Sequence, residues 1–177
     1  MILIIDFGSQ YNQLIARRVR ECHIYCQIEP PEITIERIKS INPEGIILSG
    51  GPSSIYEKQS PKIDKAIFNM KIPILGICYG MQFMIGSMGG VVKKAKKREY
   101  GFAELNIRTR SDLLQGINKT TKCWMSHGDS IEKLPAGFKT TASTLNTTIA
   151  ATEQKKNNLY GLQFHPEVEH TPQGKAI

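Results

Sequence analysis

Short apolar runs recur along the first half of the chain, and each is followed by turn residues. Three of them are continuous, Ile2–Ile5, Gly45–Ser49 and Ile72–Ile77, and Tyr25–Ile28 is a shorter, more mixed run. Runs of four to eight apolar residues are typical of strands that are buried on both faces of a parallel sheet. We therefore expect four strands in this half of the chain.

The stretches that follow these runs carry apolar residues at helical spacing. Serine, threonine and Ser-Pro signals mark where several of them begin. The expected helices run from Ser9 to about Arg20, from Thr34 to Ile41, from Ser60 to Met70 and over Met81–Ile85. This alternation predicts an α/β fold with an open, mostly parallel sheet and helices on both faces, in which ligand sites lie beyond the carboxyl ends of the strands.

The pattern changes after Gly89-Gly90, where the apolar segments become short and strand-like and are separated by turn residues. We expect additional antiparallel strands here, which extend the sheet and form a small cap over it. Asn157-Asn158 suits a hairpin turn. The expected strands are Val91-Val92, Gly101–Ile107, Trp124-Met125, Thr140–Ser143, Thr147–Thr152 and Leu159–Phe164.

The size and charge of the chain narrow the function classes. At 177 residues it has the length of one domain, and its formal net charge is +7. The dense basic run Lys93–Arg98 contains no aromatic residue on which bases could stack, so we expect no nucleic-acid partner. The run is either a solvated face or a docking surface for an acidic partner or a phosphate-bearing ligand.

Cysteine usage and the first residues indicate a cytoplasmic setting without a membrane. No apolar stretch reaches the roughly 20 residues of a membrane span. The apolar run Ile2–Ile5 is followed directly by Asp6, which is typical of a first strand and not of a signal peptide. The four cysteines show no disulfide-framework spacing. Cys22, His23 and Cys26 lack a second ligand pair, so we expect no metal site.

Gly76-Ile77-Cys78-Tyr79-Gly80 is the strongest local signal of chemistry. A strand that turns into a helix within so few residues needs small residues on both sides of the central one. Cys78 would then stand at a helix N-terminus, where unpaired N–H groups and the helix dipole favour the nucleophilic thiolate. A small buried hydrophobic cysteine is the simpler alternative, so Cys78 needs a base elsewhere in the chain.

A base and its orienting group follow the last expected strand. His165 and Glu167 are two residues apart, so on an extended segment they point the same way. His165 could move protons to and from Cys78, and Glu167 could fix its tautomer. Acyl transfer also needs N–H donors for the developing oxyanion. Tyr79, which follows the nucleophile, and Gly51, at a neighbouring strand end, are the candidates.

Three motifs, in this order and spacing, resemble the class I (triad) glutamine amidotransferases. They are Ser49-Gly50-Gly51-Pro52, Gly76–Gln82 and Gln163–Glu167. Further motifs are similar to the glutaminase domains of GMP synthetases; these are Asp6–Tyr11, Arg98–Gly101, Trp124–Asp129 and His170–Gly174. The resemblance covers almost the whole chain.

The resemblance implies a flavodoxin-like amidotransferase fold and a role for each matching residue. Cys78 would be the nucleophile, His165 the general acid and base, Glu167 its orienter, and Gly51 and Tyr79 the oxyanion donors. Gln82 would contact the substrate L-glutamine through its side chain. The backbone of a four-residue segment would hold the amino-acid end of the substrate; its residues are Ser126, His127, Gly128 and Asp129.

The resemblance also implies a partner for this domain. Ammonia would pass to a synthetase (ATP pyrophosphatase) domain that adenylates XMP and aminates it to GMP. ATP and Mg are expected there, and no cofactor is expected in this domain. The sequence ends at Ile177, where the resemblance implies a further helix, so we interpret residues 1–177 as one glutaminase domain, truncated at its C-terminus and without its synthetase domain. It is either an excised piece of a two-domain enzyme or a separate subunit that lacks its last helix.

Other functions remain open at this level. The chain could be the glutaminase of anthranilate or carbamoyl phosphate synthesis, or a catalytically silent regulatory module of the same fold. From the residues alone, Gln82 could be an ordinary polar residue of the first helical turn, and Ser126–Asp129 a tight turn. A nucleic-acid binder is the least favoured alternative.

Overall fold

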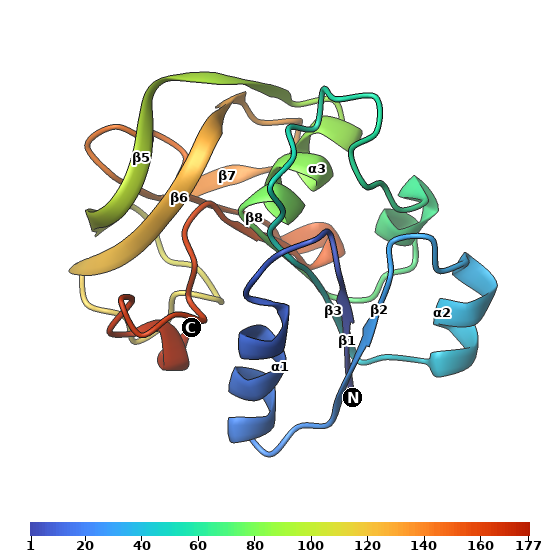
Figure 1. Cartoon of the computed structure of the whole chain (residues 1–177). Coiled ribbons are helices and arrows are strands. Elements are labelled where there is room, and N and C mark those ends of the chain that lie inside the picture. Colours follow the sequence, from blue (N-terminus) through green and yellow to red (C-terminus); the bar gives the residue numbers. More distant parts are fainter.

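The structure, a computed structural model, describes residues 1–177, apart from the side chain of Lys96. In the described residues, one sheet contains nine strands in the order β2-β1-β3-β4-β9-β8-β7-β5-β6 (Figure 1). Their bounds are β1 Ile2–Ile5, β2 Cys26–Glu29, β3 Gly45–Leu48, β4 Ile74–Ile77, β5 Val91–Ile107, β6 Thr120–Lys133, β7 Lys139–Ser143, β8 Ala151–Gln154 and β9 Leu159–Leu162.

Five neighbouring strands, from β2 to β9, are parallel, and helices cover both of their faces. The α-helices are α1 Asn12–Glu21, α2 Ile35–Ile41 and α3 Tyr79–Ser87, and the 3-10 helices are η1 Lys65–Asn69, η2 Lys155–Asn157 and η3 Gly174–Ala176. The predicted α/β fold, with a parallel sheet and added antiparallel strands, is confirmed.

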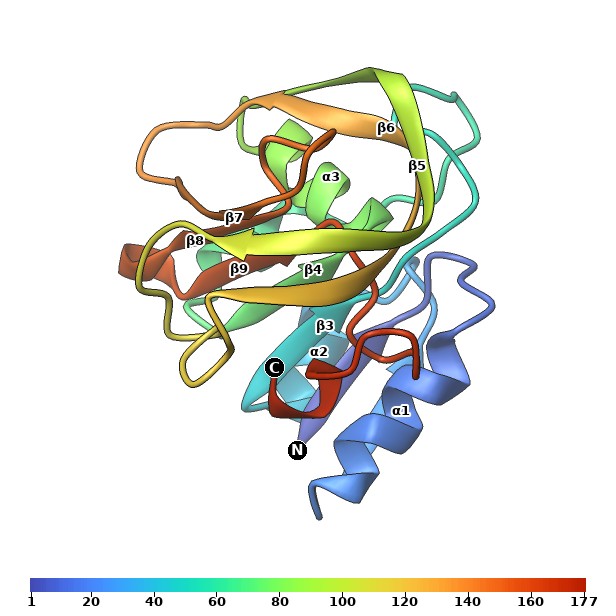
Figure 2. The same ribbon diagram turned by 90° about the vertical axis from the view of Figure 1, so that its left-hand side faces the viewer.

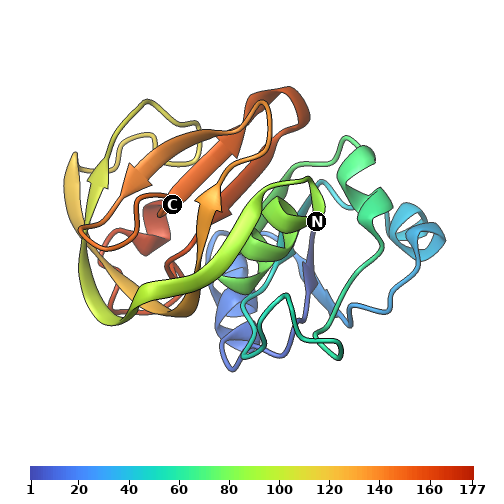
Figure 3. The ribbon, with the colours of Figure 1, turned by 90° about the horizontal axis from the view of Figure 1, so that it is seen from above.

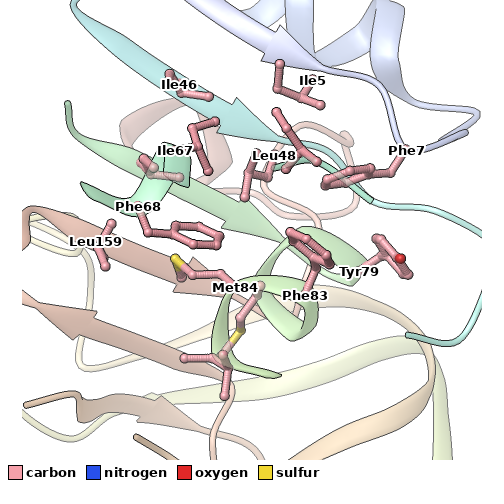
Figure 4. Close-up of a cluster of buried hydrophobic side chains, with 14 of the residues drawn as sticks. Ile5, Phe7, Ile46, Leu48, Ile67, Phe68, Tyr79, Phe83, Met84 and Leu159 are labelled. Carbon is pink, nitrogen blue, oxygen red and sulfur yellow. The ribbon is translucent and has the colours of Figure 1, made fainter. Parts of the chain in front are cut away.

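Alternate residues of the parallel strands pack on opposite faces. Ile4 packs with Ile15 of α1, whereas its neighbour Ile5 packs on the other side with Ile38 of α2. This two-residue period explains why the strands are apolar throughout. Figure 4 shows the hydrophobic core on the Ile5 face of the sheet, in which Phe83 of α3 and Leu48 of β3 pack in one cluster.

The remaining strands are antiparallel and arch away from the parallel half. β5 and β6 form a long hairpin that bends over the sheet, with β7 paired to the end of β5 (Figure 2). Seen from above, α3 lies in the middle of the molecule, where the antiparallel strands meet the parallel half (Figure 3). It contacts β3, β4, β5, β6 and β9. The cap predicted from sequence is thus the β5–β6 hairpin, and α3 lies beneath it.

Two expected helix starts differ from the structure. Ser9 does not cap α1; its Oγ accepts the N–H of Tyr11 (3.0 Å), and α1 begins at Asn12. Ser60 starts no helix, because its hydroxyl donates back to the carbonyl of Glu57 (2.8 Å). The short 3-10 helix η1 begins later, where Asp64 accepts the N–H of Ala66 (2.9 Å). The Thr34 cap of α2 is confirmed.

The described chain contains no helix that is long and apolar enough to span a membrane.

Close packing of α3 on β3 gives a testable prediction. A Cβ at Gly80 would lie 2.2 Å from the carbonyl oxygen of Leu48, which is fixed backbone, so Gly80→Ala should destabilise the fold by about 3 kcal/mol or more. Gly86→Ala, in the same helix, is the matched control. Its Cβ would meet only the flexible Cδ1 of Ile55, at 2.9 Å, so its free energy of unfolding should stay within about 1 kcal/mol of wild type. Urea denaturation measures both, and equal losses would contradict the close contact at Gly80.

Candidate active site

Cys78 lies at the abrupt turn between β4 and α3. Its backbone has φ 50° and ψ −106°, a left-handed φ that is uncommon for a residue with a side chain. Its N–H donates to the carbonyl of Leu162 in β9 (2.7 Å), and the N–H of Gly80 donates to that of Ser49 (3.0 Å). A Cβ at Gly76 would lie 2.6 Å from the backbone nitrogen of Met81. Backbone atoms lie so close to these positions that the residues two places before and after Cys78 have to be glycines.

His165 and Glu167 lie just beyond β9 and are hydrogen-bonded to each other. His165 Nδ1 is 2.7 Å from Glu167 Oε1, and the two residues are 4% and 3% exposed. Backbone bonds fix the histidine: its N–H donates to Trp124 O (3.0 Å), and its carbonyl accepts from the Thr171 hydroxyl (2.7 Å). Arg18 of α1 donates to the carbonyl of Glu167 (2.9 Å). The ring thus has one fixed orientation, which leaves Nε2 as the nitrogen that bonds to the sulfur of Cys78.

Cys78 and His165 lie side by side across Gly50. A Cβ at Gly50 would lie 3.2 Å from His165 Cε1 and 3.7 Å from Cys78 Cβ, so a side chain here would crowd the His165 ring. Burial opposes a charge on the His165 ring, but hydrogen bonds to the sulfur of Cys78 and to Glu167 outweigh it and raise the pKa of His165 to about 10. At neutral pH the ring is an imidazolium beside the sulfur.

A cavity of about 360 Å³ opens beside the sulfur. Gly51 and Tyr79 both line it. Tyr79 is the first residue of α3, where a helix leaves its N–H groups without a partner in the helix. A Cβ at Gly51 would lie 2.5 Å from the carbonyl oxygen of Phe7, so this position also has no room for a side chain. The full lining is Gly51, Pro52, Ser53, Ser54, Glu57, Cys78, Tyr79, Gln82, Arg98, Tyr100, Ser126, His127, Gly128 and Asp129.

The Ser126–Asp129 segment of β6 forms the wall opposite α3. Cys78 Sγ lies 3.6 Å from the carbonyl oxygen of Ser126. The carbonyl of Asp129 accepts from Gln82 Nε2 (3.0 Å) and lies 2.8 Å from His127 Nδ1. Gln82 Nε2 also donates to Gln163 Oε1 (3.1 Å). Because the side-chain nitrogen of Gln82 donates both of its hydrogen bonds to other residues of the protein, only its Oε1 is free to bind a ligand.

Comparison with known proteins matches this geometry to one family. The model of the class-I glutamine amidotransferases matches residues 3–177. The chain belongs to the class-I glutamine amidotransferase family. It is 53% identical over 99% of its length to the GMP synthase [glutamine-hydrolyzing] of Brachyspira hyodysenteriae and 54% identical over its whole length to that of Alkaliphilus metalliredigens. It covers 34% and 35% of these two proteins, so it spans about a third of the curated relatives that it matches.

Solved structures agree with the family assignment. A candidate GMP synthase subunit from Thermoplasma acidophilum matches 98% of this chain and 87% of its own, with a TM-score of 0.89 and 32% identity. A glutamine amidotransferase from Thermotoga maritima, with a TM-score of 0.78 over 94% of this chain and 76% of its own, is 22% identical and shares the fold.

In this amidotransferase, a buried polar cluster fixes the β6 wall of the cavity. The Glu99 carboxylate accepts from the hydroxyls of Thr144 (3.0 and 3.1 Å) and Thr147 (2.5 Å) and lies 3.7 Å from His127 Nε2. Burial lowers the pKa of His127, against the opposing effects of the Asp129 carbonyl and Glu99. His127 therefore stays neutral at pH 7 and acts as a fixed hydrogen-bonding group that supports the segment carrying Asp129.

The structure brings all ten sequence-predicted site residues of the amidotransferase to one place, although their roles stay predictions. Six other residues line the cavity that the sequence did not predict as site residues: Pro52, Ser53, Ser54, Glu57, Arg98 and Tyr100. Ser54 donates to Asp129 Oδ2 (2.5 Å). In the sequence, Tyr100 belonged only to a family motif, and Arg98 belonged to that motif and to the basic run Lys93–Arg98. Among the described residues there is no group of three or more His, Cys, Asp or Glu side chains that could hold a metal ion.

The coupling of His165 to Cys78 predicts a shift in titration. Cys78→Ala should lower the pKa of His165 from about 10, because the hydrogen bond to sulfur disappears while burial, which opposes the charge, remains. A raised pKa stabilises the folded protein fully below the ordinary value of about 6.5, and this contribution is lost as the pH rises towards 10. Cys78→Ala should therefore lose part of the pH dependence of stability in this window.

Ring ¹⁵N chemical shifts of His165 followed across this pH range measure the change. Cys123→Ala is the matched control, because it removes a fully buried thiol from a different cluster of the core. A His165 titration that is the same in Cys78→Ala and in wild type would contradict the coupling.

Proposed function

We propose that the chain is a glutaminase that hydrolyses L-glutamine through a Cys-His-Glu triad and supplies ammonia for the synthesis of GMP. The observation that carries this proposal is the placement of Cys78, His165 and Glu167 at the ends of β4 and β9, beside a cavity large enough for an amino acid. The names of the full-length relatives support the GMP assignment.

Cys78 and His165 divide the chemistry between them. The Cys78 sulfur attacks the side-chain amide carbon of glutamine and gives a tetrahedral intermediate. The His165 imidazolium donates its proton to the amide nitrogen, ammonia leaves, and a glutamyl thioester remains. Neutral His165 then takes a proton from water, the hydroxide displaces the sulfur, and glutamate is released. Glu167 holds the ring through Nδ1, so that the proton always moves at Nε2.

The N–H groups of Gly51 and Tyr79 are the proposed oxyanion donors. A primary amide is a poor electrophile, so stabilisation of the negative oxygen must supply much of the acceleration. Removal of one such donor typically costs about 2.7–4 kcal/mol in transition-state stabilisation. Both donors belong to backbone that is fixed by close packing, which gives the preorganisation that this effect requires.

The proposed partner is a synthetase (ATP pyrophosphatase) domain or subunit, because this chain spans about a third of relatives named GMP synthase. ATP and Mg would act on that partner, where XMP is adenylated and aminated, and we assign no cofactor to this chain. We also propose a cytoplasmic location, since a reducing compartment keeps a cysteine nucleophile as a free thiol.

Substitution of the triad tests the proposed mechanism. Cys78→Ala should abolish release of ammonia from glutamine, because no other group forms the thioester, with a loss of roughly 10⁴-fold or more in kcat. Glu167→Gln should lose roughly 10²-fold, because it disturbs only the orientation and charge of His165. Both are measured with the synthetase partner present. Full turnover by Cys78→Ala would exclude the mechanism, and equal collapse of the two variants would give Glu167 a direct chemical role.

A reconstitution experiment tests the pathway. The chain is mixed with a purified synthetase domain of a GMP synthase, XMP, ATP, Mg and glutamine, and formation of GMP is measured. Glutamine-dependent GMP supports the proposal. Glutaminase activity without GMP would favour another pathway, such as anthranilate or carbamoyl phosphate synthesis. Absence of labelling at Cys78 by a glutamine-analogue electrophile would favour a silent module of the same fold.

A further inference from the structure

The basic run is interrupted at the cavity by a wide bulge in β5. Lys94 pairs with Asp129 and Glu99 pairs with His127, so the four residues 95–98 of β5 lie opposite the single residue Gly128 of β6. Bulges turn side chains out of the regular alternation of a strand. The last residue of this bulge, Arg98, lines the cavity beside Cys78.

Arg98 and Tyr100 lie over Gly128. A Cβ at Gly128 would be 3.9 Å from Arg98 Nε and 3.7 Å from the Tyr100 hydroxyl. Arg98 is the one lysine or arginine among the described residues that line this cavity, and no ion pair holds it within the described part of the chain. Lys93 of the same basic run is, by contrast, paired with Glu132 (2.6 Å).

The distance along β6 from Ser126, which the sulfur contacts, to Gly128, over which Arg98 lies, suits the length of glutamine. Cys78 Sγ contacts the carbonyl of Ser126, and Gly128 lies two residues farther along the strand, a rise of roughly 6.5 Å. The amide carbon and the α-carboxylate carbon of glutamine are separated by four bonds, about 5 Å when extended. A substrate whose amide carbon meets the sulfur and whose chain runs along β6 would reach Gly128 with its other end.

We propose that Arg98, assisted by the Tyr100 hydroxyl, binds the α-carboxylate of the substrate and makes the site specific for free α-amino acids. A guanidinium presents two parallel N–H donors that fit a carboxylate. The carboxylates of Glu57 and Asp129 line the same cavity and suit the α-ammonium group. This inference rests on the proposed glutaminase function and assigns to Arg98 the selection of substrate, with no part in the bond-breaking steps.

The rate of labelling at Cys78 tests this role without requiring turnover. The probe is 6-diazo-5-oxo-L-norleucine, a glutamine analogue with a free α-carboxylate that loses N₂ as the sulfur bonds to its terminal carbon. Arg98→Met should slow labelling about 10- to 100-fold, the value of a charged hydrogen bond. Labelling by iodoacetamide, which has no carboxylate, should change less than about threefold, and Arg98→Lys should recover part of the loss.

Lys97→Met is the matched control. It removes the same charge from the same bulge, at an exposed residue that does not line the cavity, and should label like wild type. Turnover gives a second readout: Arg98→Met should raise KM for glutamine, and Lys97→Met should not.

Each outcome decides a separate point. Equal labelling of Arg98→Met and wild type by the diazo compound overturns the inference and leaves the glutaminase proposal standing. A parallel loss with iodoacetamide also overturns it, because the variant would then have disturbed Cys78 itself. Wild-type protein that resists the diazo compound and releases no ammonia from glutamine overturns the proposed function and this inference with it.

Discussion

The sharp reversal of the backbone at Cys78 is the constraint on which the rest of the structure depends. The chain can turn there only because Gly76 lies against Met81 and Gly80 lies against Leu48, at distances that exclude a Cβ. The same contacts pack α3 directly on the ends of β3 and β4, and its N-terminus points at the sulfur. Strain at φ 50° persists because the surrounding packing leaves no alternative. The turn therefore positions the proposed nucleophile and sets the electrostatic field around it.

The order of the strands in the sheet then places His165 and Glu167 beside Cys78. β9 enters the sheet beside β4, and the bond from the Cys78 N–H to Leu162 O aligns the ends of the two strands. His165 follows three residues later and is bonded in turn to Trp124 of β6. The triad thus lies where the parallel strands, α3 and the β5–β6 hairpin meet. Residues far apart in sequence share one site because neighbouring parallel strands end at the same edge.

Much of this arrangement could be predicted from the sequence, since buried strands, glycine-flanked turns and a His-x-Glu strand end are local patterns. What failed were features decided by tertiary contacts. Ser60 looked like a helix cap, yet its hydroxyl bonds back to Glu57, so the helix starts later and is shorter. β5 was expected as two short strands, but pairing with β6 holds residues 91–107 in one bulged strand. Arg98 was missed for the same reason, because no local pattern shows which way a bulge turns a side chain.

The two buried histidines of the site show how similar residues acquire opposite protonation. His165 bonds directly to Glu167 and to the sulfur of Cys78, and these bonds outweigh the cost of burying its charge. His127 also has a carboxylate nearby, but both oxygens of Glu99 are already occupied by threonine hydroxyls, so burial dominates. A charge on His165 further disfavours a second charge on His127. One ring can therefore transfer protons while the other stays neutral and holds the wall of the cavity in place.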